Sequence, residues 1–210
     1  MENLEEIIEQ IHQSFEAKTI ARENALSQAR KLIRESANTI RAVHRDEFSL
    51  AREHLNEART LAQSLNKNLD KHPDLFFAGY TQDALKEFAE ASITFALISN
   101  GNLPSPDELN LTHATYLKGL AESVGELRRR SLDLLRRNKS QEAEKCLQYM
   151  DDIYAVLVTM DYPNAITGGL RRLTDIARGI TERTRGDLTI SIKQERLEKS
   201  LAEFTKMITK

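Results

Sequence analysis

The chain has 210 residues, of which 40% are hydrophobic and 30% charged, and its formal net charge is −2. This length and composition are typical of a soluble globular domain with one sizeable core, and they exclude a disordered chain. No stretch approaches the roughly 18 apolar residues of a membrane-spanning helix, and the N-terminus is acidic where a secretory signal is basic. The single cysteine, Cys146, cannot form an internal disulfide. We therefore expect a cytoplasmic protein without a membrane partner.

Residues that interrupt helices are scarce, with eight glycines and four prolines. Residues 3–70 contain neither, and apolar residues recur there at helical spacing, which predicts two long helices or one bent helix. Further helices are expected over about 72–99, 107–138, 140–159, from 164 to a point between Gly179 and Gly186, and 188–208. The predicted fold class is therefore all-α, a single-domain antiparallel bundle of about six or seven helices over residues 1–210.

Two acidic motifs lie on two of these expected helices, Glu87-Phe-Ala-Glu90 and Glu122-Ser-Val-Gly-Glu126. Helix positions three or four apart share a face, so each motif presents two carboxylates in one direction. Glu90 lies between two alanines in an apolar run. A buried carboxylate without a partner is very costly, so these side chains need a compensating charge or a metal ion.

Oxygen ligands alone favour a hard cation, Mg2+ or Mn2+, over zinc or iron. Neither motif has the Glu-x-x-His pattern of ferritin-like di-iron sites. Such a metal site is typical of a metal-dependent nuclease, in which the ion activates water and stabilises a leaving oxygen. The alternative is that Glu87 and Glu126 are surface residues with local salt bridges to Lys86 and Arg129. Spacing alone leaves both interpretations open.

Arginines gather in three clusters although the chain as a whole is slightly acidic. The clusters are Arg41 with His44 and Arg45; Arg128, Arg129, Arg130, Arg136 and Arg137; and Arg171, Arg172, Arg178, Arg183 and Arg185. Arginine favours bidentate binding of phosphate, whereas the alternative is a set of solvated helix faces with acidic neighbours. Three clusters together favour nucleic acid as a partner.

Four segments of this chain resemble the translin/TRAX family, in the same order. They are Ser36–Arg45, which ends in an aliphatic-His-Arg sequence; Ala84–Ala91 with its Glu-x-x-Glu motif; Lys118–Arg128 with its Gly-Glu-Leu sequence; and Gly169–Leu188. Each motif is short, but their order and spacing along one helical chain are specific. The resemblance spans most of residues 20–205 and implies a translin-like helical bundle.

The resemblance to TRAX-type subunits implies a Mg2+-dependent endoribonuclease that cleaves single-stranded RNA inside a hollow octamer. By position, the catalytic acids and metal ligands of that family correspond to Glu87, Glu90 and Glu122. The third acid is usually Asp in TRAX subunits, so Glu122 is a departure. Glu126 matches a nearby family Glu and is expected as a fourth ligand or as a partner of a ligand. Translin-type subunits lack the full acidic set, so the alternative is a non-catalytic protein that binds single-stranded RNA or DNA.

The family also carries a basic His/Arg pair before its first acidic motif, where this chain has aromatic residues at 76–80. Phe77 or Tyr80 could stack on a base instead, although packing in the core is expected for at least one of them. The residues expected to contact nucleic acid are Arg41, His44, Arg45, Arg129 and Tyr80. His44 could equally be a buried core or interface histidine. With no second subunit type known, a homo-oligomer such as an octamer is the simplest assembly.

Overall fold

The computed structural model describes residues 3–208, which form nine α-helices and no strand. Six of these helices are long and three are single turns of four residues. The all-α prediction is confirmed. The chain divides into two compact units, Met1–Gly119 and Leu120–Lys210, with the division inside one helix. The single-domain expectation remains a prediction.

The first unit contains α1 (Leu4–His44), α2 (Phe48–Asn68), α3 (Pro73–Phe76), α4 (Gly79–Ile98), α5 (Pro106–Leu109) and the beginning of α6 (His113–Leu135). The second unit contains the remainder of α6, α7 (Ser140–Val158), α8 (Asn164–Thr167) and α9 (Leu170–Ile208). Between residues 3 and 208 there is no helix with the length and hydrophobicity needed to cross a bilayer.

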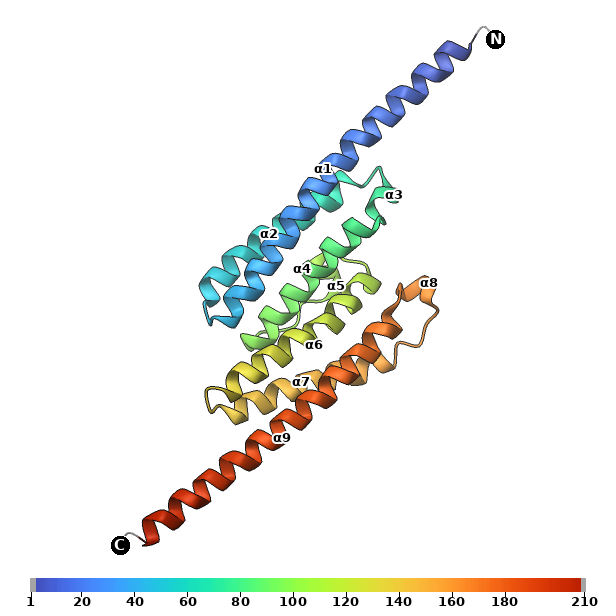
Figure 1. Ribbon diagram of the computed structural model, residues 1–210. Coiled ribbons are helices and arrows are strands. Elements are labelled where there is room, and N and C mark those ends of the chain that lie inside the picture. Colours follow the sequence, from blue (N-terminus) through green and yellow to red (C-terminus); the bar gives the residue numbers. More distant parts are fainter. Residues whose placement is uncertain (1–2, 209–210) are drawn as a thin grey trace. The chain divides into compact units, whose positions relative to one another are not determined.

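The break that the sequence could not place within residues 3–70 lies at Asp46, between α1 and α2. Asp46 adopts a left-handed conformation with φ 63°, which Asp tolerates better than most residues. The turn brings α2 back along α1, and α4 packs against both helices (Figure 1). Near the turn, buried Val43 and Ala51 contact Phe95 of α4. The core of this unit is thus built where three helices meet.

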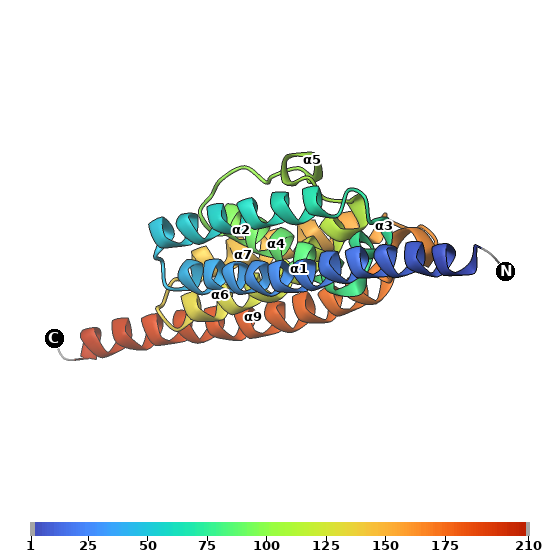
Figure 2. The same ribbon diagram turned by 90° about the horizontal axis from the view of Figure 1, so that it is seen from above.

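The sequence predicted one helix over about 107–138, but the structure divides this segment into α5 and α6. Ser105 and Glu108 begin α5 with a capping box, in which each side chain bonds to the other's main-chain N–H. The helix ends after one turn because Asn110 takes a left-handed conformation. Figure 2 shows α5 beside α2, where the Asn66 amide donates to the main-chain oxygen of Asn110 at 2.8 Å.

The last part of the chain corrects the prediction of two separate helices after residue 164. The break lies at Gly168 and Gly169, which both have positive φ, and α9 then runs without interruption through Gly179 and Gly186. An interior glycine costs a helix about 1 kcal/mol. Packing against α7 offsets that cost, because buried side chains such as Ala177 recur along α9 on both sides of Gly179.

Candidate functional site

The first acidic motif lies within α4, the most buried helix of the chain. Glu87 and Glu90 are one helical turn apart, so their carboxylates point in the same direction. Glu90 is only 9% exposed, between the fully buried Ala89 and Ala91. Glu87 is half-buried and pairs with Lys86 at 3.2 Å. Glu87 therefore forms the local salt bridge expected from one interpretation of the sequence, and it also points in the same direction as Glu90, as the other interpretation expected.

Gly119 of α6 lies directly against the α4 main chain beside Glu90. A methyl group added at Gly119 would lie 2.5 Å from the Ala89 Cβ, 2.9 Å from the Glu90 nitrogen and 3.0 Å from the Lys86 oxygen. Only glycine permits this approach, because real Cβ atoms essentially never come closer than 3.0 Å to a neighbour. A glycine that would otherwise weaken the helix thus has a packing role next to the acidic motif.

Helix α6 continues without interruption from Gly119 to Glu122, less than one turn later. One carboxylate oxygen each of Glu87, Glu90 and Glu122 lies within 4.8 Å of the other two. No other group of three such ligands was found among residues 3–208.

The donor set of these three residues fits a hard divalent cation. Two oxygens bound to one Mg2+ at about 2.1 Å lie no more than about 4.2 Å apart. Three oxygens on one ion include at most one such opposite pair, and neighbouring oxygens lie about 3.0 Å apart. The oxygens here are within 4.8 Å of one another, so the side chains would rotate toward one another to bind one ion. Glu126, also half-buried on α6, is outside this group of three. Its role as a fourth ligand stays a prediction.

The residues expected to bind nucleic acid divide by exposure. Arg41, Arg45 and Arg129 are exposed. His44 is only 5% exposed, which favours the buried role that the sequence left open. Other arginines of the clusters form ion pairs with acidic neighbours, such as Arg128 with Asp187 at 2.9 Å. The exposed arginines therefore remain the candidates for phosphate contact.

The two aromatic residues before the first acidic motif, Phe77 and Tyr80, also differ in exposure. Phe77 is 66% exposed and packs edge-to-face on Phe76, with ring centroids 4.9 Å apart. The Tyr80 hydroxyl is buried and has no hydrogen-bond partner within residues 3–208. Of the two aromatic residues, Phe77 is thus better placed to stack on a base.

Sequence reasoning missed a polar network that connects α1 and α2 through Glu35. The His54 ring nitrogen Nδ1 lies 2.8 Å from the Glu35 carboxylate, and the Asn38 amide donates to the same oxygen at 3.3 Å. Burial raises the pKa of Glu35, but the hydrogen bonds from His54, Asn38 and Arg34 together outweigh it, so the pKa lies below its ordinary value. The spacing of Glu35 and Asn38 was visible in the sequence, whereas the position of His54 depends on the turn at Asp46.

Cys146 offers no chemistry to the site. Its thiol is buried, and this burial raises its pKa to about 11. Because the thiolate is the nucleophilic form, Cys146 is inert at neutral pH.

The fold and the carboxylates together define an all-helical protein with a candidate site for a divalent cation. Over 189 residues, 88% of the chain and 82% of the relative, it is 34% identical to an uncharacterized protein of Methanocaldococcus jannaschii. Two solved structures, AfC3PO and its complex with duplex RNA, are each 31% identical and cover 90% of this chain and 98% of theirs, with TM-scores of 0.83.

Apo-NeC3PO shares the fold with a TM-score of 0.81 at 21% identity, over 88% of this chain and 96% of its own. No family model matches the sequence. C3PO is the complex formed by translin and TRAX subunits. The chain belongs to the translin/TRAX family.

Proposed function

We propose that this protein is a Mg2+-dependent endoribonuclease that cleaves single-stranded RNA as a homo-oligomer. The observation that supports this most directly is the group of Glu87, Glu90 and Glu122, whose carboxylate oxygens approach one another within 4.8 Å. The similarity to AfC3PO, whose structure was solved with duplex RNA, supports RNA as the ligand.

In this proposal the three carboxylates hold the cation, with Mn2+ as an alternative to Mg2+. When bound, the cation would supply an activated water and stabilise negative charge on the leaving oxygen. Glu90 is held in place by its buried neighbours on α4, and this rigidity favours a defined ligand position. The exposed Arg41, Arg45 and Arg129 would neutralise phosphates, and Phe77 would stack on a base.

The homo-oligomer, with an octamer as the expected form, has support from the first part of α1. Large apolar side chains are exposed there along one side of the helix, and a contiguous patch of this kind marks a protein contact surface.

The test is cleavage of an end-labelled single-stranded RNA by the full chain with Mg2+ or Mn2+. Glu90→Gln and Glu122→Gln are each expected to lower the rate by about a hundredfold or more, because each removes a charged ligand. Glu57→Gln, which changes an exposed carboxylate of α2, is the matched control and should retain full activity. Cleavage that survives both EDTA and Glu90→Gln would contradict the proposal.

The second candidate is a non-catalytic protein that binds single-stranded RNA or DNA. It is favoured by Glu122, which stands where TRAX-type subunits usually carry Asp. It predicts salt-sensitive binding without cleavage in either metal. Single-stranded RNA, duplex RNA and single-stranded DNA compared at one salt concentration would establish which ligand this chain binds.

A further inference from the structure

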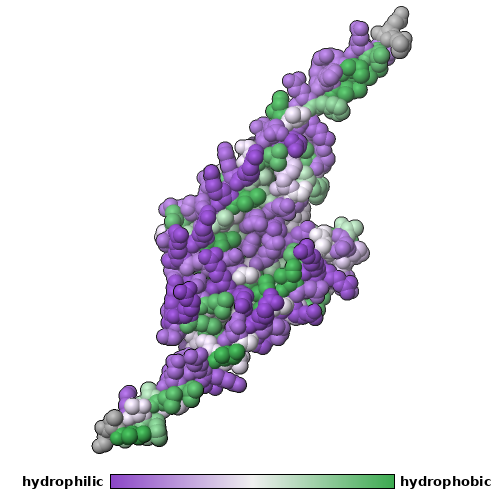
Figure 3. All heavy atoms as spheres, in the orientation of Figure 1, coloured by the Kyte–Doolittle hydropathy of each residue, from purple (hydrophilic) through white to green (hydrophobic). Residues whose placement is uncertain are grey.

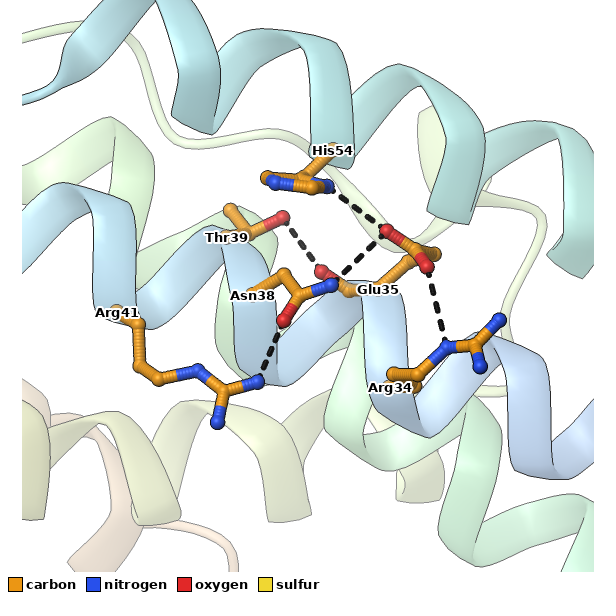
Figure 4. Close-up of polar contacts among 6 residues, drawn as sticks. All are labelled: Arg34, Glu35, Asn38, Thr39, Arg41 and His54. Carbon is orange, nitrogen blue, oxygen red and sulfur yellow. Dashed lines mark hydrogen bonds and ion pairs between the residues drawn. The ribbon is translucent and has the colours of Figure 1, made fainter.

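The polar network of Figure 4 extends from the contact between α1 and α2 to the exposed side chain of Arg41. The inner end is the Glu35 carboxylate, 14% exposed, which binds His54 of α2 and Asn38 of its own helix. The outer end is Arg41, whose guanidinium donates to the Asn38 side-chain oxygen. Asn38 therefore links the contact between the two helices to the arginine.

The chemistry of its two partners fixes the orientation of the Asn38 amide. An ionised carboxylate only accepts hydrogen bonds, so the Asn38 nitrogen must face Glu35. A guanidinium only donates, so the Asn38 oxygen must face Arg41. His54 in turn must carry a proton on Nδ1 to donate to Glu35. In this network each donor thus faces an acceptor, and only one orientation of the Asn38 amide is compatible with both partners.

This arrangement restricts Arg41 without using up its capacity to bind an anion. The guanidinium has five N–H donors, and Asn38 accepts from the nitrogen Nη2 only. Arg45 is also exposed and follows directly after the last residue of α1, four positions after Arg41. Because an arginine normally loses much rotamer freedom when it binds a phosphate, an arginine held beforehand binds more tightly.

We infer that Glu35, Asn38 and His54 are positioning residues that hold Arg41 ready to bind an RNA phosphate. The inference rests on the proposed function, in which Arg41 contacts RNA. It adds a role for three residues that do not touch the RNA themselves. The same network also links α1 to α2, so the experiment must separate positioning from stability.

The experiment measures binding of a fluorescently labelled single-stranded RNA by anisotropy, in EDTA so that no cleavage occurs, over a series of salt concentrations. The full chain carries Asn38→Ala, Arg41→Ala or both. Asn38→Ala is expected to weaken binding about threefold to tenfold when Arg41 is present, and to change nothing further when Arg41 is absent.

The salt dependence gives a second readout that a purely structural role does not produce. Arg41→Ala removes one phosphate contact and should lower the slope of log affinity against log salt by about 0.7 for a single strand. Asn38→Ala keeps the charge of Arg41, so its slope should equal that of the unchanged chain. His54→Gln, which keeps an N–H donor, should retain more affinity than His54→Ala.

Thr39→Val is the matched control, because Thr39 donates at 2.9 Å to the main-chain oxygen of Glu35 and lies outside the side-chain network. Its RNA affinity should be unchanged. Equal losses from Asn38→Ala with and without Arg41, or no loss while Arg41→Ala weakens binding, would overturn the inference. If Arg41→Ala binds RNA normally, the inference fails although RNA binding stands. If the unchanged chain binds no RNA, the proposed function itself fails.

Discussion

Helix α4 and the first part of α1 depart from the ordinary distribution of side chains in opposite ways. In α4, the carboxylate of Glu90 is buried between fully buried alanines. In α1, the large apolar residues before Ala25 are exposed by 42–65%: Leu4, Ile7, Ile8, Ile11, Phe15 and Ile20. Figure 3 shows hydrophobic surface along one side of this part of the helix. A buried carboxylate requires a compensating partner or a bound cation, and an exposed apolar surface of this kind marks a contact with another subunit.

The two halves of α1 also contrast with each other. Ala25 is the first buried residue of the helix, and from there α1 contributes to the core with side chains such as Leu32. Before Ala25 the large apolar side chains of the same amphipathic pattern remain exposed. A pattern that recurs at helical spacing therefore predicts a helix, but it does not tell whether its apolar side packs within the chain or between chains.

The largest expected effect comes from testing this contrast with one truncation in each half. Leu32→Ala removes a fully buried side chain and should lower the free energy of unfolding by about 2–5 kcal/mol. Phe15→Ala, in the exposed half, should change the unfolding of the dissociated chain by less than about 0.5 kcal/mol. Denaturant unfolding at low protein concentration measures both values.

Under the proposed homo-oligomer, Phe15→Ala should instead lower the assembled mass measured by sedimentation. Full assembly by this variant and by Ile11→Asp would show that the exposed half of α1 is not a subunit contact.

The next largest expected effect is the stabilisation of the fold by Mg2+ bound at the Glu90 carboxylate, under the proposed function. At a Mg2+ concentration one hundred times the dissociation constant, a bound cation adds about 2.7 kcal/mol to the stability of the folded state. Mg2+ should therefore raise the melting temperature of the unchanged chain and of Glu57→Gln, but not that of Glu90→Gln. Differential scanning fluorimetry with and without EDTA measures the shift. An equal rise in all three proteins would place the cation elsewhere.

Two glycines of α6 allow a test of the close approach beside Glu90. Gly119→Ala puts a methyl group against the α4 main chain and should destabilise the protein by about 1–3 kcal/mol. At Gly125 an added Cβ meets nothing within 4 Å. Gly125→Ala should therefore stabilise the protein by about 0.5–1 kcal/mol, because alanine is the better helix former. Equal stability of the two variants would show that Gly119 does not pack closely against the α4 main chain.

The sequence predicted the helical class because that class depends on local spacing. Local spacing also put Glu87 and Glu90 on one side of a helix, whereas the choice of Glu122 as the third acid came from the resemblance to TRAX subunits, and the role of all three stays a prediction. The sequence could not predict that Gly119 sets the contact between α4 and α6, since this depends on the main chain of a distant segment. It predicted that a helix ends between Gly179 and Gly186, whereas α9 continues through both glycines. Packing against α7 offsets the low helix propensity of glycine there. Sequence reasoning also named Tyr80 and not Phe77 as a nucleic-acid contact, although the fold buries the Tyr80 hydroxyl and exposes Phe77.

The smallest expected effect concerns Glu35, a mostly buried carboxylate that has hydrogen-bond partners on two helices, Asn38 of α1 and His54 of α2. Its pKa is lowered in the folded state, so its ionised form stabilises the fold above the ordinary Glu pKa of about 4.3. That contribution is lost as pH falls through the lower, folded-state pKa. In Glu35→Gln, which cannot ionise, unfolding free energy should therefore decrease less between pH 5 and pH 3, the range around about 4 in which carboxyl groups titrate. Denaturant unfolding at each pH measures this.

The matched control is Glu57→Gln, whose unfolding free energy should change with pH in the same way as that of the unchanged chain. The same dependence on pH in all three proteins would show that His54 and Asn38 do not stabilise the Glu35 charge.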